Sequence, residues 1–201
     1  VKPRNRNLML KRNLFFIDTE SSGLHHEDGC EITEVYATAF NYWDLSPHHA
    51  GPFHAFIKPQ RPEKAQAGAL KVIGEGWTIA QTKGLDPKIV WSNFVEWVES
   101  INSEGNVMGK PIAYAYNQDH DRRFLVGTLK EYKVITKDDK WGWDYPWGFM
   151  FDGMQSIYEL FHMSPNLVNL KLDTAFELLN MKRDTNHHTA KEDVEKFAEM
   201  M

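Results

Sequence analysis

The stretch 14-LFFIDTESSGL-24 carries an apolar run directly into two acids, Asp18 and Glu20. The apolar run predicts a buried strand over residues 13–19, which ends before Gly23. Side chains alternate between the two faces of a strand, so Asp18 and Glu20 share one face. Because a buried charge is costly unless it is paired, these acids either cap a turn at the end of the strand or bind a cation.

The composition is that of a chain that folds around one core. It has 201 residues, of which 42% are hydrophobic and 13% aromatic, and this favours a single domain. The only cysteine, Cys30, excludes an internal disulfide and a cysteine-rich zinc site, and it fits a reducing compartment. No apolar run approaches the roughly 20 residues of a membrane helix, and residues 8–10 are too short for a signal-peptide core. We therefore expect a cytoplasmic protein with no membrane contact.

The first twelve residues form a basic arm, which contains no acid and carries five basic residues: Lys2, Arg4, Arg6, Lys11 and Arg12. A flexible, solvated arm and an arm that contacts phosphate are both consistent with this pattern. We expect residues 13–201 to form the single folded domain.

The hydrophobic pattern predicts an α/β fold with a central mixed sheet flanked by helices. Closely spaced β runs near the start suggest an antiparallel meander, and Asp86-Pro87 is a good helix start. Further strands are predicted at residues 31–40, 53–58 and 112–116. Helices are predicted at residues 62–74, 87–102, 121–132, 153–162, 170–180 and 189–200, and an irregular aromatic loop at residues 136–150.

Two further stretches place acids beside predicted core elements. In 112-IAYAYNQDHDRRFL-125, a strand ends at Asn117, which can cap the next helix, and Asp121 suits the first turn of that helix. In 188-HTAKED-193, Asp193 lies close to the inward stripe of the last helix. An acid in that position is unusual without a partner.

Together the ordered motifs Asp18-x-Glu20, Asn117-x-x-x-Asp121 and His188-x-Ala190-x-x-Asp193 resemble the DEDD superfamily of 3′→5′ exonucleases. More narrowly they are similar to the DEDDh branch, the DnaQ-like and RNase T-like enzymes. The similarity covers residues 14–198 and implies a ribonuclease H-like fold with about five strands, the first three antiparallel.

The resemblance has local departures from the family pattern. Family members often carry Thr-Thr-Gly where this chain has Ser21-Ser22-Gly23, and an aromatic residue where it has His120. No position of the four acids or the histidine is lost.

The resemblance implies two Mg²⁺ ions, for which Mn²⁺ substitutes, held by Asp18, Glu20, Asp121 and Asp193. It also implies that His188 is the general base for hydrolysis, a task that suits an imidazole near neutral pH. Converging carboxylates repel one another, and cations remove that conflict. Two divalent ions also bring the net charge of −5 to about −1, which admits a polyanionic substrate.

Substrate contacts are expected at the turn that follows the first acids. The resemblance assigns substrate binding to Thr19, Ser21, Ser22, Gly23, Leu24 and Asn117. Leu24 is either a wedge against the last base or a core residue. The aromatic loop, with Trp141, Trp143, Tyr145 and Trp147, either stacks on bases or is pinned to the helices.

The leading interpretation is a metal-dependent exonuclease that releases nucleoside 5′-monophosphates from 3′ ends of single-stranded DNA. The alternatives are an exoribonuclease of the RNase T or oligoribonuclease type and an inactive nucleic-acid-binding protein with the same fold. A role in proofreading would require a polymerase or another replication or repair protein as partner.

Overall fold

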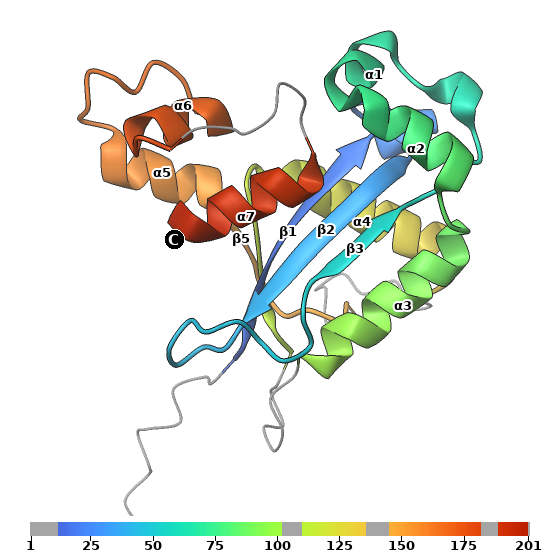
Figure 1. Ribbon diagram of the computed structural model, residues 1–201, viewed down its shortest axis with the longest axis horizontal. Helices are drawn as coiled ribbons and strands as arrows, with labels where there is room; N and C mark the ends of the chain where they lie inside the picture. The colour runs from blue at the N-terminus through green and yellow to red at the C-terminus, as the bar shows by residue number, and fades with distance from the viewer. Residues whose placement is uncertain (1–11, 102–109, 136–144, 182–188, 201) are drawn as a thin grey trace, which may run out of the picture.

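A five-stranded mixed sheet forms the centre of the protein, which a computed structural model describes over residues 12–101, 110–135, 145–181 and 189–200. The strand order is β3-β2-β1-β4-β5, with β1, β2 and β3 antiparallel and β4 and β5 added in parallel. The strands are β1 (Leu14–Ser21), β2 (Ile32–Phe40), β3 (Phe53–Phe56), β4 (Ile112–Ala115) and β5 (Met150–Asp152). The predicted fold class and the antiparallel arrangement of the first three strands are confirmed (Figure 1).

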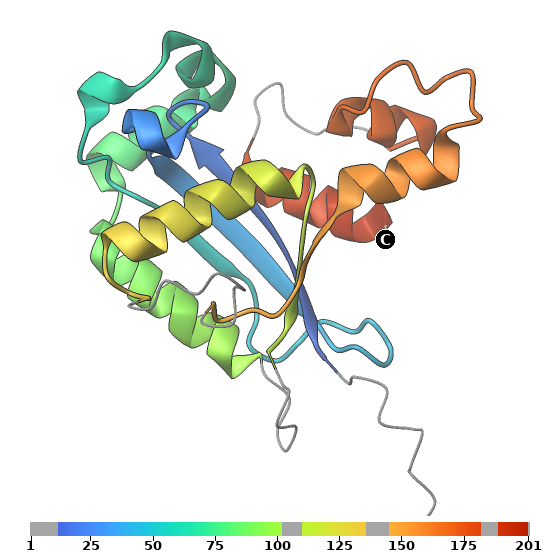
Figure 2. The same cartoon turned by 180° about the vertical axis from the view of Figure 1, so that it is seen from behind.

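Helices cover both faces of this sheet. Helix α7 lies across one face in Figure 1, and α3 and α4 cover the other in Figure 2. The helices are α1 (Ala67–Ile73), α2 (Glu75–Lys83), α3 (Pro87–Ser100), α4 (Gln118–Glu131), α5 (Gly153–Phe161), α6 (Leu172–Leu178) and α7 (Ala190–Met200), with short 3₁₀ turns η1 (His26–Asp28) and η2 (Pro62–Lys64).

Alternate residues of β1 divide between the two layers. Phe15 and Ile17 belong to the larger core, which includes Trp91 of α3 and Phe124 of α4. Phe16 points the other way and meets the ring of Phe197 in α7 at 5.2 Å, edge to face. Because the period is two, Asp18 and Glu20 continue the row of Phe16 and face α7.

The prediction of one helix over residues 62–74 is wrong in detail, and α2 was not expected. The chain forms η2 and then α1, and it turns at Gly74, whose φ of 60° favours glycine. Helix α2 buries only Ala80, so its sequence EGWTIAQTK shows no apolar stripe that would have predicted it.

The predicted loop over residues 136–150 is wrong at its end, because Met150 begins the edge strand β5. A three-residue strand is too short to show an alternating pattern. Residues 136–144, with Trp141 and Trp143, lie outside the described residues. Tyr145 and Trp147 are buried and stacked, with ring centroids 5.4 Å apart. These two side chains therefore hold the end of the loop against the core and are not exposed for stacking on bases.

The other boundaries agree closely with the predicted elements. Helix α3 begins as expected, since the Asp86 side chain accepts hydrogen bonds from the backbone N–H groups of Lys88 (2.9 Å) and Ile89 (3.2 Å). Helix α4 begins at Gln118, three residues earlier than predicted, which keeps Asp121 in its first turn.

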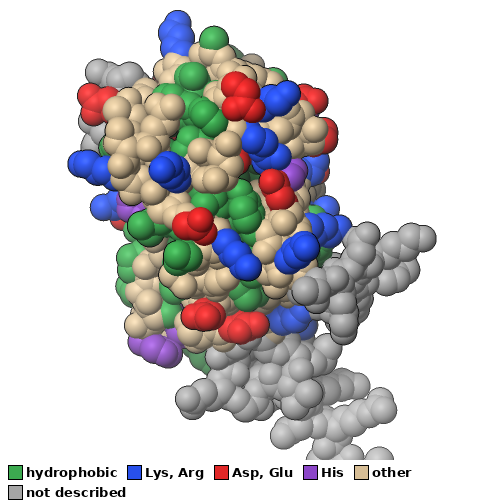
Figure 3. Space-filling view, turned by 90° about the vertical axis from the view of Figure 1, so that its right-hand side faces the viewer, with side chains coloured by type: hydrophobic (Ala, Val, Ile, Leu, Met, Phe, Trp, Pro, Cys, Tyr) green, Lys and Arg blue, Asp and Glu red, His purple; other side chains and the backbone are tan. Residues whose placement is uncertain are grey.

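The basic arm falls almost wholly in residues 1–11, outside the described residues. Its last residue, Arg12, is buried, and its guanidinium lies 5.8 Å from the ring centre of Phe149. Figure 3 shows acidic and basic side chains interspersed on the side of the molecule that it presents. Among the described residues, no helix has the length and apolar character that would take it through a bilayer.

Candidate active site

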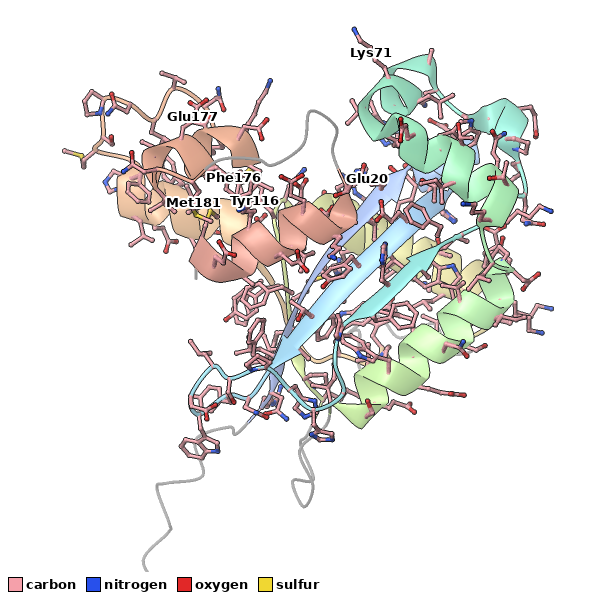
Figure 4. The ribbon with its side chains drawn as sticks, viewed as in Figure 1. Glu20, Lys71, Tyr116, Phe176, Glu177 and Met181 are labelled. Carbon is pink, nitrogen blue, oxygen red and sulfur yellow. The ribbon has the colours of Figure 1, made fainter. Side chains whose placement is uncertain are left out.

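Three carboxylates meet where the carboxyl end of β1 lies against α7. Ligand oxygens of Asp18, Glu20 and Asp193 all lie within 4.8 Å of one another. The apolar face of α7, with Val194 and Phe197 on the sheet, aims Asp193 at the strand. Figure 4 shows Glu20 at the end of β1. The fold therefore brings Asp193, from the far end of the sequence, to the two predicted acids of β1.

The fourth predicted acid, Asp121, reaches β1 from the first turn of α4. It is 2% exposed, and its Oδ1 accepts a hydrogen bond of 2.8 Å from the hydroxyl of Thr19. Burial raises the pKa of Asp121 to about 7, although hydrogen bonds from the side chain and backbone of Thr19 lower it. Asp121 lies outside the group of three oxygens within 4.8 Å, and it adjoins that group through Asp18, whose pKa it raises.

The negative charges of this cluster repel one another. Burial raises the pKa of Asp18 well above its usual range, and the neighbouring carboxylates of Asp121, Asp193, Glu20 and Glu34 raise it further, in that order. A divalent cation would relieve both effects. The donors are all hard carboxylate oxygens, which suit Mg²⁺ or Mn²⁺. The cation explanation for Asp18 and Glu20 therefore fits the geometry better than the turn-cap explanation.

Two further acids border the site and were not predicted. Glu34 lies opposite Glu20 on β2, is 2% exposed, and has its Oε1 within hydrogen-bond distance, 2.8 Å, of Nε2 of His54. Asp152, at the end of β5, contributes to the raised pKa of Asp121. A signal for Asp152 existed, since it follows an apolar run and caps α5 through Met154 N–H (2.9 Å).

The turn after β1 is fixed from several sides. The register between β1 and β2 shifts between Glu20 and Ser21. The Ser21 hydroxyl donates to the carbonyl of Gly23 at 2.7 Å, and Ser22 exchanges hydrogen bonds with Glu31, with its backbone N–H donating and its hydroxyl accepting, both at 2.8 Å. Leu24 is 66% exposed, so its interpretation as a core residue is wrong and the wedge interpretation stays a prediction.

His120 lies against this turn from α4. Its Nε2 is 3.3 Å from the Ser21 hydroxyl. Because that hydroxyl gives its only proton to Gly23, His120 must be the donor, which requires a proton on Nε2. Burial, then Arg123 and His25, lower the pKa of His120, which favours the neutral ring. The ring also lies 4.8 Å from Phe124, so this histidine keeps the packing role expected of an aromatic residue.

Asn117 does not cap α4 with its side chain. It occupies the N-cap position with φ of 60° and makes no side-chain capping bond to the described residues. Its backbone N–H instead donates to Asp152 at 3.1 Å. The side chain is exposed and is available for the substrate contact that the resemblance implies.

The remaining predicted residue, His188, lies outside the described residues. The described chain resumes at Thr189, which caps α7: its carbonyl accepts from Asp193 N–H at 3.1 Å and its hydroxyl from Glu192 N–H at 3.2 Å. The helix that carries Asp193 therefore begins two residues after His188 in the sequence.

The α5–α6 segment flanks the site on one side. The Tyr116 hydroxyl donates to the carbonyl of Leu170 at 2.9 Å, and its ring meets Phe197 at 5.8 Å. Tyr116 thus ties β4 to this segment and to α7. In Figure 4, Tyr116, Phe176 and Met181 lie on this side of Glu20, and Lys71 of α1 lies on the opposite side.

Known structures share this fold, although no protein-family model and no curated protein matches the sequence. E. coli exonuclease I in a complex with single-stranded DNA superposes with a TM-score of 0.72 at 17% identity, over 94% of this chain and 39% of that one. Cell-death related nuclease 4 (CRN-4) gives 0.70 at 14% identity, over 94% of this chain and 62% of that one.

The nuclease domain of 3′hExo, a DEDDh family member bound to rAMP, gives a TM-score of 0.67 at 16% identity. It is matched over 96% of this chain and 90% of its own length. The chain therefore has the fold of these nucleases, and it spans about two-fifths of the exonuclease I chain.

Proposed function

We propose that the protein is a metal-dependent 3′→5′ exonuclease that acts on single-stranded DNA. The observation that carries this proposal is the group of Asp18, Glu20 and Asp193 oxygens within 4.8 Å, with Asp121 beside it, on a fold shared with exonucleases. Each of these acids matches a position of the DEDDh motifs in order.

In this proposal, the carboxylates of Asp18, Glu20, Asp193 and Asp121 would hold two Mg²⁺ ions. When bound, the ions polarise the scissile phosphate and the attacking water. Mn²⁺ has the same preference for oxygen ligands and would substitute.

The remaining residues place the strand and move the proton. A ring nitrogen of His188 takes the proton from the water. The water oxygen bonds to phosphorus, and the bond from phosphorus to the 3′ oxygen of the preceding nucleotide breaks. The products are a nucleoside 5′-monophosphate and a strand one nucleotide shorter.

Substrate is held by the turn after β1. The backbone of Ser21, Ser22 and Gly23 meets the terminal 3′ hydroxyl, and the exposed Leu24 packs against the last base. Thr19 supports Asp121, and the exposed Asn117 contacts the strand from the start of α4.

RNA is the second candidate substrate. Single-stranded DNA is favoured by the likeness to exonuclease I, which was solved with a dT13 oligonucleotide. The likeness to 3′hExo, solved with rAMP, favours an exoribonuclease. An inactive nucleic-acid-binding protein is the less favoured third reading, because the four acids and the histidine are all present.

The test uses oligonucleotides of one sequence made as DNA and as RNA, each labelled at the 5′ end or at the 3′ end, with Mg²⁺, Mn²⁺ or EDTA. We expect a ladder from the 5′-labelled DNA and immediate release of mononucleotide from the 3′-labelled DNA, with metal only. Faster cleavage of RNA would select the alternative, and no metal-dependent release from either would overturn the enzyme proposal. A polymerase or other replication or repair partner stays a prediction, which co-purification with tagged protein from its native cells would test.

A further inference from the structure

Gln66 bridges the two sides of Gly23 in the turn that follows β1. Its backbone N–H donates to the carbonyl of Ser22 at 2.7 Å, and its side-chain Oε1 accepts from the backbone N–H of Leu24 at 3.2 Å. One residue therefore holds the peptide groups on either side of the glycine. Both distances lie within the range of protein hydrogen bonds.

The side chain of Gln66 also lies directly over Gly23. A Cβ atom at position 23 would stand 2.7 Å from Cδ of Gln66 and 2.3 Å from Sγ of Cys30. The glycine is thus enclosed between a buried thiol beneath and the Gln66 amide above. The two hydrogen bonds and this packing fix the position of the turn relative to Gln66.

Gln66 connects this turn to the helices on one side of the site. It is the residue before α1, and Lys71 of α1 stands across from Tyr116 and Phe176 in Figure 4. The other restraints on the turn come from β2, through Glu31, and from α4, through His120. Of these three residues, Gln66 is the one that forms a hydrogen bond with the backbone of Leu24, the residue proposed to meet the terminal base.

We propose that Gln66 is a positioning residue that sets the 3′-terminal subsite: it holds the Ser22–Leu24 backbone in the arrangement that accepts a free 3′ hydroxyl. This inference rests on the proposed nuclease function and adds a determinant of end recognition to it. Gln66 is assigned neither to the metal ions nor to the scissile phosphate, so its loss should weaken binding of the strand end and leave the chemical step intact.

The test is Gln66→Met, which keeps a side chain of similar length over Gly23 and removes the acceptor of the Leu24 bond. Steady-state cleavage is measured on two DNA oligonucleotides that differ only in a 3′-hydroxyl or a 3′-deoxy terminus. We expect KM for the hydroxyl substrate to rise about threefold to tenfold, the size of one hydrogen bond, with kcat unchanged. The preference for the hydroxyl terminus should fall by the same factor, because the deoxy substrate never used that contact.

Two controls separate positioning from a general loss of stability. Gln60→Met changes an exposed glutamine whose amide donates to the carbonyl of Lys58, and it should leave KM and the end preference as in wild type. Gln66→Glu restores an acceptor for Leu24 N–H and should recover most of the end preference. Thermal melting of each variant in EDTA records any change in folding.

The outcomes are distinguishable. An active wild-type protein whose end preference and KM survive Gln66→Met would overturn the role of Gln66 and leave the nuclease proposal standing. A fall in kcat alone would also overturn it. A wild-type protein that cleaves neither substrate would overturn the proposed function and this inference together.

Discussion

The hydroxyl of Thr19 donates to Oδ1 of Asp121 at 2.8 Å, a bond that joins β1 to the first turn of α4 across 102 residues of sequence. Thr19 is buried and Asp121 is 2% exposed. The strand residue between the two acids of the first motif therefore orients the acid of the second.

Thr19→Val should disturb the site without changing any acid. It keeps the shape of the side chain and removes the donor, so a buried carboxylate loses a partner. We expect the free energy of unfolding to fall by about 1–3 kcal/mol and the Mg²⁺ concentration for half-maximal activity to rise. Urea unfolding in EDTA and metal titration of cleavage measure the two effects. Thr19→Ser keeps the hydroxyl and should behave nearly as wild type; if the two variants are alike, the bond does not orient Asp121.

The metal-free protein should lose stability as pH rises. The folded-state pKa values of Asp18 and Asp121 lie above the usual carboxyl value of 3.8, at about 7 for Asp121. A raised carboxyl pKa gives stability that is present below about pH 4 and is lost as pH rises through about 7. We expect Tm in EDTA to be higher at pH 5 than at pH 8. Mg²⁺ should raise Tm more at pH 8 than at pH 5, because it binds the ionised form. A Tm in EDTA that rose from pH 5 to pH 8 would contradict the assigned repulsion.

Asp18→Asn should lower the rate of cleavage and raise the stability of the metal-free protein. The substitution removes a metal ligand, so cleavage should fall by about a thousandfold or more, the scale of several kcal/mol of transition-state stabilisation. It also removes one charge from the repelling cluster, so Tm in EDTA at pH 8 should rise. Asp28→Asn, at an exposed acid of η1, is the matched control and should change neither quantity. Full activity of Asp18→Asn would remove this acid from the proposed centre.

His188→Ala should lose activity while metal binding is retained. The ring is proposed to take the proton from water, so kcat should fall by about 10²- to 10⁴-fold, with Mg²⁺ affinity by calorimetry little changed. The neighbouring His187→Ala tests whether the effect belongs to one ring, and it should be nearly silent. Equal effects of the two variants would leave His188 without a specific role.

Gly23→Ala should distort the turn after β1, which is proposed to bind the strand end. The added Cβ would stand 2.3 Å from Cys30 Sγ and 2.7 Å from Gln66 Cδ, so the turn or its neighbours must shift. We expect a lower Tm and a higher KM. Adding Cys30→Ala removes the sulfur atom and should recover part of both losses, whereas Cys30→Ala alone should cost only the packing of a small buried side chain. A double variant no better than Gly23→Ala would place the conflict elsewhere.

Sequence patterns predicted most of the fold where an element had a strong period or a clear cap. Three sequence features predict the bounds of their elements: the apolar run before Asp18, the Asp86-Pro87 start of α3 and the apolar stripe of α7. Helix α2 and strand β5 were missed because one buries a single alanine and the other has three residues. Their positions depend on the rest of the fold rather than on local pattern.

The candidate site divides in the same way. Asp18, Glu20, Asp121 and Asp193 are predicted as site residues through ordered motifs, which constrain residue type and spacing. Gln66, Glu34 and Asp152 form hydrogen bonds with partners far away in sequence, namely Leu24, His54 and Asn117. The apolar run before Asp152 is a local signal for that acid, whereas nothing local in the sequence marks that Gln66 meets Leu24 or that Glu34 meets His54.

The carboxylate group draws on both ends of the domain, and this has a consequence for how the protein matures. Asp18 and Glu20 leave the ribosome early, and Asp193 follows only after the rest of the described chain. Domains generally acquire their structure during synthesis as units, so a nascent chain that lacks α7 has three of the four acids and no complete cation site. Metal affinity would therefore report the docking of α7, and the proposed nuclease activity would begin only when α7 has packed against β1.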